Sequence, residues 1–518
     1  NAIFRGYNYT IDNTDIICIS DYLLTKYKDN YTVNWSLSTK KHANLDLLYN
    51  KLFEYIINTK IYKNKLNHNI SLLLYYDQLI RHNNKYNKYS CEYLKFSTYV
   101  AFNILHSKDF HLLSQEELIF TLLTLRHNHS LKLKYLCLKK LKSYKKYIDN
   151  SLYYRFLKNT IIDINNTKLK QGFNPLILEN GIIDFSDIID NSYNNKVIDN
   201  NNNELLERNM EKQFNEIIKN EDKIAISISG GVDSMVCSYI LSKIYKKEII
   251  LIHICYNNRN ECLKEIQFLN DWSKFLNCKL YIRVIDELKR ENNSKYREIY
   301  EYCTRHIRFT FYEYFKCPVI LGHNKDDCLE NIFSNLSKQI HFDNLLGMDK
   351  IGYENNVTIL RPLLQFTKKD IINIALKNNI PFLKDSTPKW SRRGKMRDIL
   401  IPQIYNFDKN ILNGLYNISQ YYNSLSQQQN IYMNNWINDN VLRENNKLII
   451  NKDNFFHNNY KNNTFWVKIW FTLELDTRPS NKSFNNLITN IKNNKVIKCD
   501  LNKKYKAFVE KKEIIIIY

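Results

Sequence analysis

The chain has 518 residues, too many for a single hydrophobic core, and this length predicts about three domains of ordinary size. Lys and Arg number 75 against 53 Asp and Glu, and the net charge of +22 favours a polyanionic partner such as RNA over an acidic protein. Asn, Lys, Ile and Tyr are abundant along the whole chain, so codon bias can explain part of that charge.

Eleven cysteines without a C-x-x-C pair argue against a disulfide framework and a zinc knuckle, and for a reducing compartment. No apolar run approaches the roughly 20 residues that span a bilayer, and the first residues do not form a signal peptide, so we expect no membrane association.

Residues 1–160 are predicted to form an all-α domain. Apolar residues recur there at helical spacing, with almost no Gly or Pro between the periodic segments. The expected helices are 45–57, 70–82, 91–105, 115–125 and 131–141.

Two segments of this domain, 71–82 (SLLLYYDQLIRH) and 115–130 (QEELIFTLLTLRHNHS), resemble a bacterial family of uncharacterised all-helical proteins. That family is built like tetratricopeptide repeats and carries a LLLDQFPRN signature. Asp77, Gln78 and Arg81 match the signature, whereas its proline is replaced. The resemblance implies no defined function for this domain.

The polar residues of the same segments also have structural explanations. Asp77 and Arg81 are one helical turn apart, and we interpret them as an i,i+4 ion pair rather than as catalytic groups. His127 and His129 lack further ligands at metal spacing, so a structural role is favoured for them.

The remaining chain is predicted to contain a linker (161–203) with one short hairpin, an α/β domain (204–405), a helical connector (406–440) and a small α+β domain (441–518). In the α/β domain, apolar strands alternate with helix-length segments, which indicates a parallel sheet with helices on both faces. Its expected strands are 224–228, 249–256, 280–284 and 319–322, and its expected helices are 261–276, 296–315 and 328–336. Ligands of such sheets bind at the carboxyl ends of the strands, where His253 and His323 lie.

The first of these strands leads into a loop of sequence SGGVDS, which consists of Ser229, Gly230, Gly231, Val232, Asp233 and Ser234. Two glycines allow the backbone to approach a ligand closely, and the amides at the start of the next helix attract phosphate. The serines add hydroxyl donors. A Walker-type loop has a longer glycine spacing and a Lys before its Ser or Thr, and neither is present. The alternative is an ordinary Gly-Gly turn after a core strand.

A second polar stretch, 321–336 (LGHNKDDCLENIFSNL), gathers His323, Asp326, Asp327 and Glu330 before an apolar helix. Adjacent carboxylates need a cation or a basic partner, and Mg²⁺ on ATP phosphates is a natural one. Alternatively, Asp326 and Asp327 cap the helix and stabilise its dipole. Both interpretations are compatible.

These motifs resemble those of one enzyme family. SGGVDS is similar to the pyrophosphate loop of the N-type ATP pyrophosphatases, which cleave ATP between the α and β phosphates, and 321–336 resembles the HHxDDQxET motif of the tRNA(Ile)-lysidine synthetases within them. Further segments resemble the ARxxRY, RPLL, IPxxxDxSN and RNxIRxxLLP motifs and the C-terminal tRNA-binding domain of that family, at 304–309, 361–364, 380–386, 393–402 and 478–518. The resemblance covers about 204–518 and departs from the family pattern at Cys328, Asn331 and Gly394.

The resemblance implies that ATP adenylates the wobble cytidine of a tRNA(Ile) with a CAU anticodon at the 2-position, and that lysine then displaces AMP to form lysidine. It implies ATP and Mg²⁺ as cofactors and tRNA(Ile) and lysine as substrates. The implied catalytic residues are Asp233, His323, Asp326 and Asp327; the loop 229–234 and Arg308 bind ATP; Arg305, Arg361, Arg393 and Arg397 contact tRNA or phosphate; and Asp327 and Glu330 bind Mg²⁺.

Three alternatives stay open at this point. The basic run 392–397 (RRGKMR) can be a solvated face. The enzyme can be a tRNA thiolase of the same superfamily, for which Cys303 and Cys328 are the candidate cysteines. Finally, the chain can be an RNA- or protein-binding module with a vestigial ATP site. We expect a cytoplasmic protein, with a plastid or other organelle as the alternative; a homodimer and a partner bound through residues 1–160 are compatible with the sequence.

Overall fold

The computed structural model describes Leu73, Asp77 and residues 90–517, with gaps at 108–109, 179–183, 194–199, 219–220, 260, 292–293, 339–344, 386–390, 445, 452–462, 474, 476–477, 494–496 and 503. Contacts group the described chain into two compact units. The first contains the residues up to 322 together with 353–362 and 371–384, and the second contains 323–352, 363–370 and 385–518. Within these described ranges no helix has the length and apolarity needed to cross a membrane.

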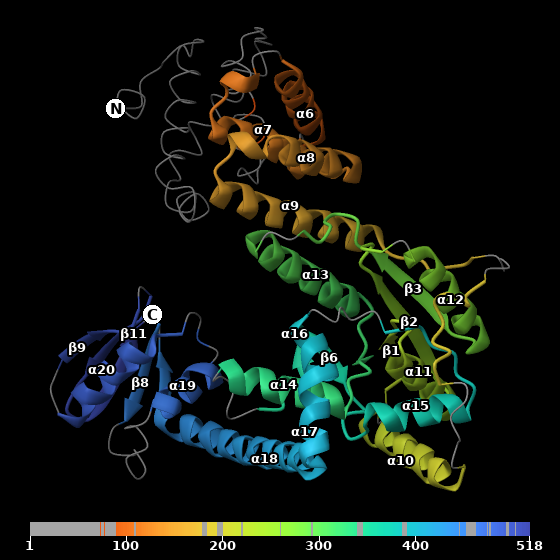
Figure 1. Ribbon diagram of the computed structural model, residues 1–518. Helices are drawn as coiled ribbons and strands as arrows, with labels where there is room; N and C mark the ends of the chain where they lie inside the picture. The colour runs from red at the N-terminus through yellow and green to blue at the C-terminus, as the bar shows by residue number, and fades with distance from the viewer. Residues whose placement is uncertain are drawn as a thin grey trace, which may run out of the picture. The chain divides into compact units, whose positions relative to one another are not determined.

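The first unit begins with the helical part that the periodicity predicts (Figure 1). Its elements are α6 (Ser90–His106), η3 (Phe110–Leu112), α7 (Gln115–His127), α8 (Leu131–Ser143), η4 (Lys145–Tyr147) and α9 (Asn150–Gln171). A capping box starts α7, because Ser114 Oγ accepts the N–H of Glu117 at 3.3 Å and the Glu117 carboxylate accepts the N–H of Ser114 at 2.7 Å. The expected helices 45–57 and 70–82 lie outside the described residues, apart from Leu73 and Asp77, and the tetratricopeptide-like resemblance stays a prediction.

Helix α9 extends past the predicted domain limit at residue 160. Asp149 caps its start by accepting the N–H of Ser151 at 2.7 Å, and Gly172, at φ 81°, follows its end. Eleven residues that the sequence assigned to a linker, 161–171, therefore continue the helix. Among the described residues of the predicted linker, the β pairing is a single bridge from Ile189 to Leu383 rather than a hairpin.

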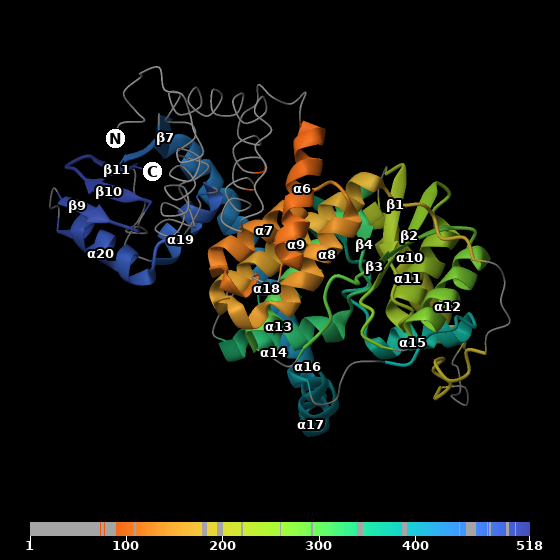
Figure 2. The same ribbon diagram turned by 90° about the horizontal axis from the view of Figure 1, so that it is seen from above.

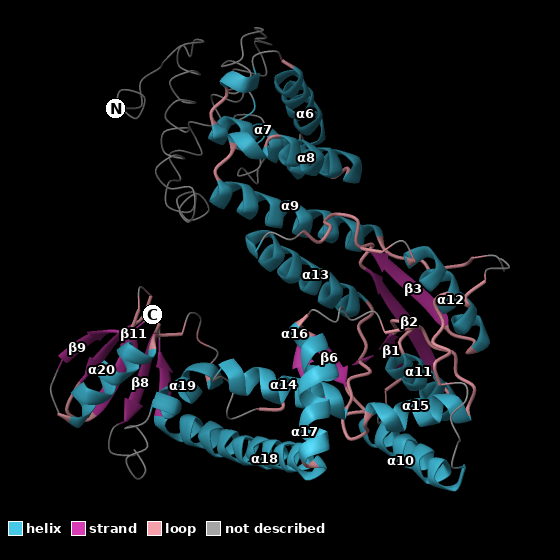
Figure 3. Cartoon of the chain, viewed as in Figure 1, coloured by secondary structure: helices cyan, strands magenta, loops and turns pink. Residues whose placement is uncertain are grey.

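The α/β part contains a six-stranded sheet of order β3-β2-β1-β4-β6-β5, shown in magenta in Figure 3. Its strands are β1 (Lys223–Ser227), β2 (Glu248–Cys255), β3 (Lys279–Val284), β4 (Val319–Ile320), β5 (Ile351–Glu354) and β6 (Val357–Leu360). Pairings β1–β2, β2–β3, β1–β4 and β4–β6 are parallel, which confirms the predicted parallel sheet. The helices of this part are α10 (Asn200–Ile218), α11 (Val232–Ile244), α12 (Cys262–Phe275), α13 (Ser294–Tyr314) and α15 (Lys368–Lys377).

One hydrophobic core joins the helical part to this sheet. Alternate residues of β2, Ile250, Ile252 and Ile254, share a core cluster with side chains of α7, α8, α9 and α13. Alternate residues of a strand point to the same face, so this face of the sheet shares its core with α13 and the helical part. Figures 1 and 2 both show α9 alongside α13, and the two helices are in contact.

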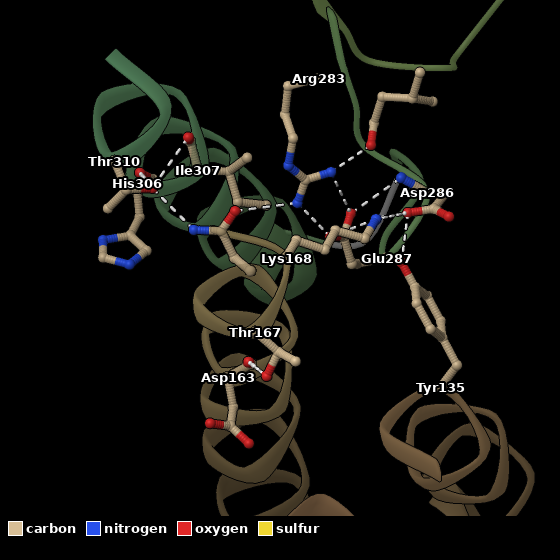
Figure 4. A network of polar contacts seen from close by, with 12 residues as sticks. Tyr135, Asp163, Thr167, Lys168, Arg283, Asp286, Glu287, His306, Ile307 and Thr310 are labelled. Carbon is tan, nitrogen blue, oxygen red and sulfur yellow. Dashed lines mark hydrogen bonds and ion pairs between the residues drawn. The ribbon is translucent and has the colours of Figure 1, made fainter. Parts of the chain in front are cut away.

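A polar network also crosses from α9 to the end of β3 (Figure 4). Arg283 of β3 is 1% exposed and forms an ion pair with Glu287, which is fully buried. The Arg283 guanidinium also donates to Asn165 of α9 at 3.1 Å, and Asn165 in turn donates to Thr310 of α13 at 2.8 Å. One buried charge pair thus fixes three elements against each other.

A second ion pair, between Lys168 and Asp286, lies at the half-buried edge of this network. Lys168 of α9 lies 2.7 Å from Asp286 and 3.3 Å from Glu287, and the Tyr135 hydroxyl of α8 donates to Asp286 at 2.6 Å. Burial alone would raise the pKa of Asp286, but the hydrogen bonds from Lys168 and Tyr135 outweigh it and lower that pKa. Asp286 therefore stays ionised and holds α8 and α9 at the end of β3.

The second unit contains α14 (Lys325–Lys338), the short helical segments α16 (Arg392–Lys395), η6 (Met396–Leu400) and α17 (Ile401–Phe407), and the long helix α18 (Lys409–Asn440). Its five-stranded antiparallel sheet has the order β7-β8-β11-β10-β9. The remaining elements are β7 (Val441–Glu444), β8 (Lys447–Asn451), α19 (Asn463–Thr472), α20 (Asn481–Lys492), β9 (Ile497–Asp500), β10 (Lys506–Val509) and β11 (Glu513–Ile517). Trp466 and Trp470 are buried at the centre of its core, which confirms the predicted small α+β domain.

The buried pair at β3 gives a testable prediction. Arg283→Met should lower the free energy of unfolding by about 3–5 kcal/mol, because the fully buried Glu287 would lose its buried partner and keep only Lys168, at 3.3 Å at the edge of the network. The control is Arg297→Met: Arg297 pairs with Glu301 at the same i,i+4 spacing, but these side chains are 54% and 62% exposed, so the loss should stay below about 1 kcal/mol.

Urea unfolding of the full chain measures both variants. Arg283→Met combined with Glu287→Leu should recover much of the lost stability, since no unpaired charge remains buried. Equal midpoints for Arg283→Met and Arg297→Met would contradict the stabilising role assigned to the network.

Candidate functional site

The predicted anion loop lies between β1 and α11, at the carboxyl edge of the parallel sheet. Gly231 precedes the first residue of α11 as its N-cap, with no side-chain cap of its own. The first N–H groups of a helix have no partner inside that helix and carry the positive end of its dipole. Residues 230–234 therefore present a backbone suited to an anion, as the sequence predicts.

Gly230 makes the turn possible. Its φ is 82°, in the left-handed region that side chains disfavour, and a Cβ placed on it would lie 2.4 Å from Cδ1 of Leu383. The carbonyl oxygen of Gly230 also accepts the N–H of Leu383 at 2.9 Å. The close approach of residue 383 thus fixes the loop and requires glycine at position 230.

The two loop serines hydrogen-bond within the loop. Ser234 Oγ accepts the N–H of Ser229 at 3.1 Å and donates to the carbonyl of Gly231 at 2.9 Å. Ser229 Oγ lies 3.3 Å from Ser234 Oγ and accepts the N–H of Gly231 at 3.4 Å. Ser234 is buried, so its hydroxyl shapes the loop in addition to any contact with a ligand.

His253 supports the loop from β2. Its Nδ1 lies 2.9 Å from the carbonyl oxygen of Ile228, the residue before the loop, so Nδ1 carries the proton of a neutral ring. Burial lowers the pKa of His253 from its ordinary value of 6.5, which keeps it neutral at pH 7. Its Nε2 is buried without a hydrogen-bond partner among the described residues. The sequence placed His253 at this edge but did not reveal its contact with the loop.

Other strand ends bring further groups to the same edge. Gly322 follows β4, and a Cβ on it would lie 3.1 Å from Cβ of Asp233 and from the backbone nitrogen of Ser234, so the chain after β4 packs directly against the first turn of α11. Arg361 follows β6 and is 9% exposed. Asp233 and Arg361 therefore both lie at the carboxyl edge of the sheet, near the ends of different strands.

Helix α13 carries two of the predicted arginines. The Tyr312 hydroxyl lies 2.7 Å from Ser227 Oγ at the end of β1, and Arg308 is one turn earlier on α13. The Nε of Arg308 is buried and has no hydrogen-bond partner within the described chain. Arg305 instead forms an ion pair with Glu354 of β5, a partner that sequence reasoning missed.

The second predicted cluster forms an ion-pair network of its own within the second unit. Arg393 pairs with both Asp327 and Glu330, and Arg397 pairs with Glu330 at 2.8 Å and with Asp385 at 2.7 Å. Asp327 and Glu330 are buried, whereas the Arg393 side chain is 54% exposed. The run 392–397 is therefore more than a solvated basic face, because two of its arginines neutralise the acidic residues of α14.

The acidic residues at the start of α14 also have structural roles. Asp327 accepts the N–H of Asn324 at 3.0 Å, and the Asn324 side chain accepts the N–H of Asp327 at 3.1 Å. Asp326 accepts the N–H of Lys368 at 2.6 Å. Capping, the alternative interpretation from the sequence, thus applies to Asp327, while His323 lies half-buried just before the helix.

The donor set does not fit a magnesium ion as it is arranged. Asp327 and Glu330 each contact guanidinium groups, and no three His, Cys, Asp or Glu side chains in the described part of the chain converge on one point. Mg²⁺ prefers carboxylate and phosphate oxygens without a competing cation. Binding of Mg²⁺ by these two residues stays a prediction.

The candidate thiolase cysteines are buried in apolar cores. Cys303 and Cys328 are both 0% exposed, and burial raises the pKa of Cys303 to about 12. A thiol with such a pKa is protonated at neutral pH and is a poor nucleophile. Both cysteines are buried, so neither is exposed to a substrate as the thiolase alternative requires.

Comparison with known proteins agrees with the loop and the sheet. Residues 202–404 match the family model described as the PP-loop domain. This part of the chain is therefore similar to the PP-loop domain, in agreement with the similarity drawn from the SGGVDS loop.

Three curated relatives come from bacteria. The chain is 28% identical to a tRNA(Ile)-lysidine synthase from Mesoplasma florum over 44% of its own length and 56% of the relative, and 34% identical to one from Mesomycoplasma hyopneumoniae over 34% and 59%. It is 26% identical to one from Malacoplasma penetrans over 53% of its own length and 90% of the relative. The chain thus spans less than two thirds of the length of the first two relatives.

The turn at Gly230 gives a second prediction. Gly230→Ala should destabilise the chain by about 1–3 kcal/mol and weaken ATP binding, because alanine is strained at this φ and meets Leu383. The control is Gly414→Ala in α18, where a Cβ meets nothing within 4 Å and should stabilise by about 0.5–1 kcal/mol. Thermal melting with and without ATP separates the two effects, and similar melting curves for both variants would contradict the strained turn.

The buried histidine gives a third prediction, on pH dependence. The pKa of His253 is lower in the folded chain than its ordinary 6.5, so the unfolded chain binds the proton first as the pH falls. The contribution of the neutral His253 ring to the free energy of unfolding is fully present above pH 6.5. It is lost as the pH falls toward the lower pKa of the folded chain. Unfolding free energies of the wild type should therefore decrease more between pH 7 and 5 than those of His253→Gln; parallel curves would contradict this.

Proposed function

We propose that the chain is an ATP-dependent ligase that joins lysine to the 2-position of the wobble cytidine of a tRNA(Ile) with a CAU anticodon. The observation that carries the proposal is the glycine-dependent loop at the carboxyl edge of a parallel sheet, within a PP-loop domain. The substrate assignment is supported by the similarity to three bacterial tRNA(Ile)-lysidine synthases. The proposed partners are ATP, lysine and tRNA, and the proposed location is the cytoplasm or an organelle that contains this tRNA.

In this proposal the loop binds the phosphates of ATP. The backbone N–H groups of residues 230–234 donate to phosphate oxygens, and the dipole of α11 stabilises the charge that develops on pyrophosphate. His253 contributes by holding the carbonyl of Ile228 and so the start of the loop. Arg308, whose Nε is buried without a described partner, supplies a guanidinium for a phosphate.

Adenylation forms a bond between the 2-oxygen of cytidine and the α-phosphorus and releases pyrophosphate. The lysine amine then attacks C2, and AMP leaves with the oxygen. The amine must lose protons in this step, and His323 and Asp326 are the proposed acceptors. We assign the exposed guanidinium of Arg393 to tRNA phosphate, with Asp327 and Glu330 as the carboxylates that orient it.

No step is assigned to a metal ion at Asp327 and Glu330, because arginines contact both carboxylates. ATP commonly brings Mg²⁺ on its own phosphates, which would neutralise charge on the leaving pyrophosphate. The described residues that we use bind and orient ATP without it.

A direct assay tests the proposal. With ATP, labelled lysine and a tRNA(Ile) that has a CAU anticodon, the protein should incorporate lysine into the tRNA and release one AMP and one pyrophosphate for each lysine. A wild-type protein that incorporates no lysine would refute the proposed reaction. Asp233→Asn should slow incorporation by about 100-fold, the magnitude typical of a lost transition-state contact.

The matched control is Asp222→Asn, the same substitution at the amino edge of the sheet, where the side chain is 96% exposed. This variant should retain the wild-type rate. Equal rates for the two variants would refute the assignment of Asp233 to the active site.

A further inference from the structure

The segment from α8 to η4 carries an unusual concentration of positive charge. Residues 131–147 contain seven lysines and no Asp or Glu. Lys134 is buried and pairs with Asp163 of α9, so it belongs to the fold. We call the other six the lysine surface: Lys132, Lys139, Lys140, Lys142, Lys145 and Lys146.

Four of the six lysines of the lysine surface are exposed, and the surface lacks acidic partners in the described chain. Lys132, Lys139 and Lys142 are exposed and share one face of α8, because their spacings correspond to about two and three helical turns. Lys146 of η4 is also exposed. None of the six forms an ion pair with a carboxylate of the described residues, unlike Lys243, Lys247 and Lys264 elsewhere in this unit.

Tyrosines lie among these lysines. Lys146 lies over the ring of Tyr147, which is 44% exposed, and Lys145 lies over the rings of Tyr153 and Tyr154 at 5.4 and 5.5 Å. An exposed aromatic ring beside ammonium groups offers a stacking surface next to phosphate-binding groups. This mixture is typical of nucleic-acid contacts.

The basic surface continues onto the PP-loop domain. The ammonium of Lys295, at the start of α13, lies 5.5 Å from the centre of the Tyr154 ring that Lys145 also contacts. About two turns further along α13, Tyr302 is 48% exposed, and the ammonium of Lys158 of α9 lies 3.4 Å from the centre of its ring. Helix α13 also carries Glu298 and Glu301, so most of the net positive charge comes from α8 and η4.

The network of Figure 4 keeps this arrangement in place. Asn165, Lys168 and Tyr135 of the helical part bond to residues at the end of β3. The lysine surface therefore has a defined position relative to α13, the helix that carries Arg305 and Arg308. A ligand that extends along the lysine surface would stay in contact with basic side chains until it reaches the PP-loop domain.

We propose that the lysine surface binds the phosphate backbone of the RNA substrate and so makes the helical part a tRNA-binding extension of the PP-loop domain. This inference rests on the proposed function for the identity of the RNA. Ammonium groups act as point charges toward phosphates and need no fixed geometry. From Lys132 to Lys146 the segment covers about 20 Å, enough for several successive phosphates. An acidic protein would need carboxylates at matching positions, whereas RNA offers regular charge along its length.

The test measures the affinity of the full chain for the tRNA(Ile) transcript with a CAU anticodon at several salt concentrations. The variant replaces Lys132, Lys139, Lys142 and Lys146 by Gln, which keeps helix propensity nearly unchanged. Its affinity at low salt should fall by about tenfold or more, and the slope of log affinity against log salt should fall by about 0.9 for each lost duplex phosphate contact.

The matched control removes the same charge from the same unit. It replaces Lys212, Lys246, Lys247 and Lys279 by Gln; these lysines are exposed, on α10 and at the amino edge of the sheet. The control should bind tRNA as the wild type does. Comparable melting temperatures for both variants would show that folding does not account for the difference.

The outcomes separate the two proposals. Wild-type affinity and salt slope in the α8 variant would overturn the inference and leave the lysines to an acidic protein partner. Equal losses in the two variants would also overturn it, since only net charge would then matter. Lysine incorporation at saturating tRNA is measured in parallel: a wild type that incorporates none refutes the proposed reaction, while a selective loss of tRNA binding still supports the lysine surface.

Discussion

The close approach of residue 383 to Gly230 is the constraint on which the candidate ATP site depends. The strand order places β1 between β2 and β4, so the loop after β1 lies where neighbouring strand ends supply His253 on one side and Gly322 on the other. Each neighbour limits the loop differently: Leu383 excludes a side chain at Gly230, His253 fixes the carbonyl before the loop, and the tight contact at Gly322 brings the first turn of α11 against β4. The amides of residues 230–234 are thus oriented by the packed sheet before any ligand binds, and such preorganisation favours binding of a phosphate.

Electrostatics divides the predicted site residues into two kinds. In the first unit, His253 is kept neutral by burial. Its Nε2 and the Nε of Arg308 are buried with no hydrogen-bond partner among the described residues, so both atoms can bond to a ligand. In the second unit, the acidic residues of α14 already contact Arg393 and Arg397. Burial alone would lower the pKa of Arg397, but Glu330 and Asp385 raise it above its ordinary value, so the arginine stays charged. Removing one partner from this network would leave a buried carboxylate unpaired, so the arginines are needed for stability as well as for any contact with phosphate.

The sequence predicted the parallel sheet, the helices of the first unit from residue 90 onward and the position of the loop, because these depend on hydrophobic periodicity and on glycine at a strand end. It did not predict the partners of the charged residues. The pairing of Arg305 with Glu354 joins residues 49 positions apart, and that of Arg397 with Glu330 joins residues 67 apart, and no local pattern reports such contacts. Asp385 lay within a recognised motif, but its pairing with Arg397 is visible only after the chain has folded. The predicted limit at residue 160 fell inside α9, where the polar residues at 163, 165 and 168 bond across to α8 and to the end of β3, contacts that the sequence does not reveal.

These same polar residues explain how an added helical part can serve a PP-loop domain. A flexible linker would leave the helical part free to reorient, and a surface on it would then act only by raising the local concentration of RNA. The pair of Arg283 and Glu287, with Asn165 inserted between β3 and α13, instead holds α9 against the sheet. Lysines on α8 then act from a fixed position, and each phosphate that they contact restricts which part of the RNA can approach the carboxyl edge of the sheet. Rigid attachment thereby converts non-specific attraction to phosphate into positioning of the substrate, a role that net charge alone cannot fulfil.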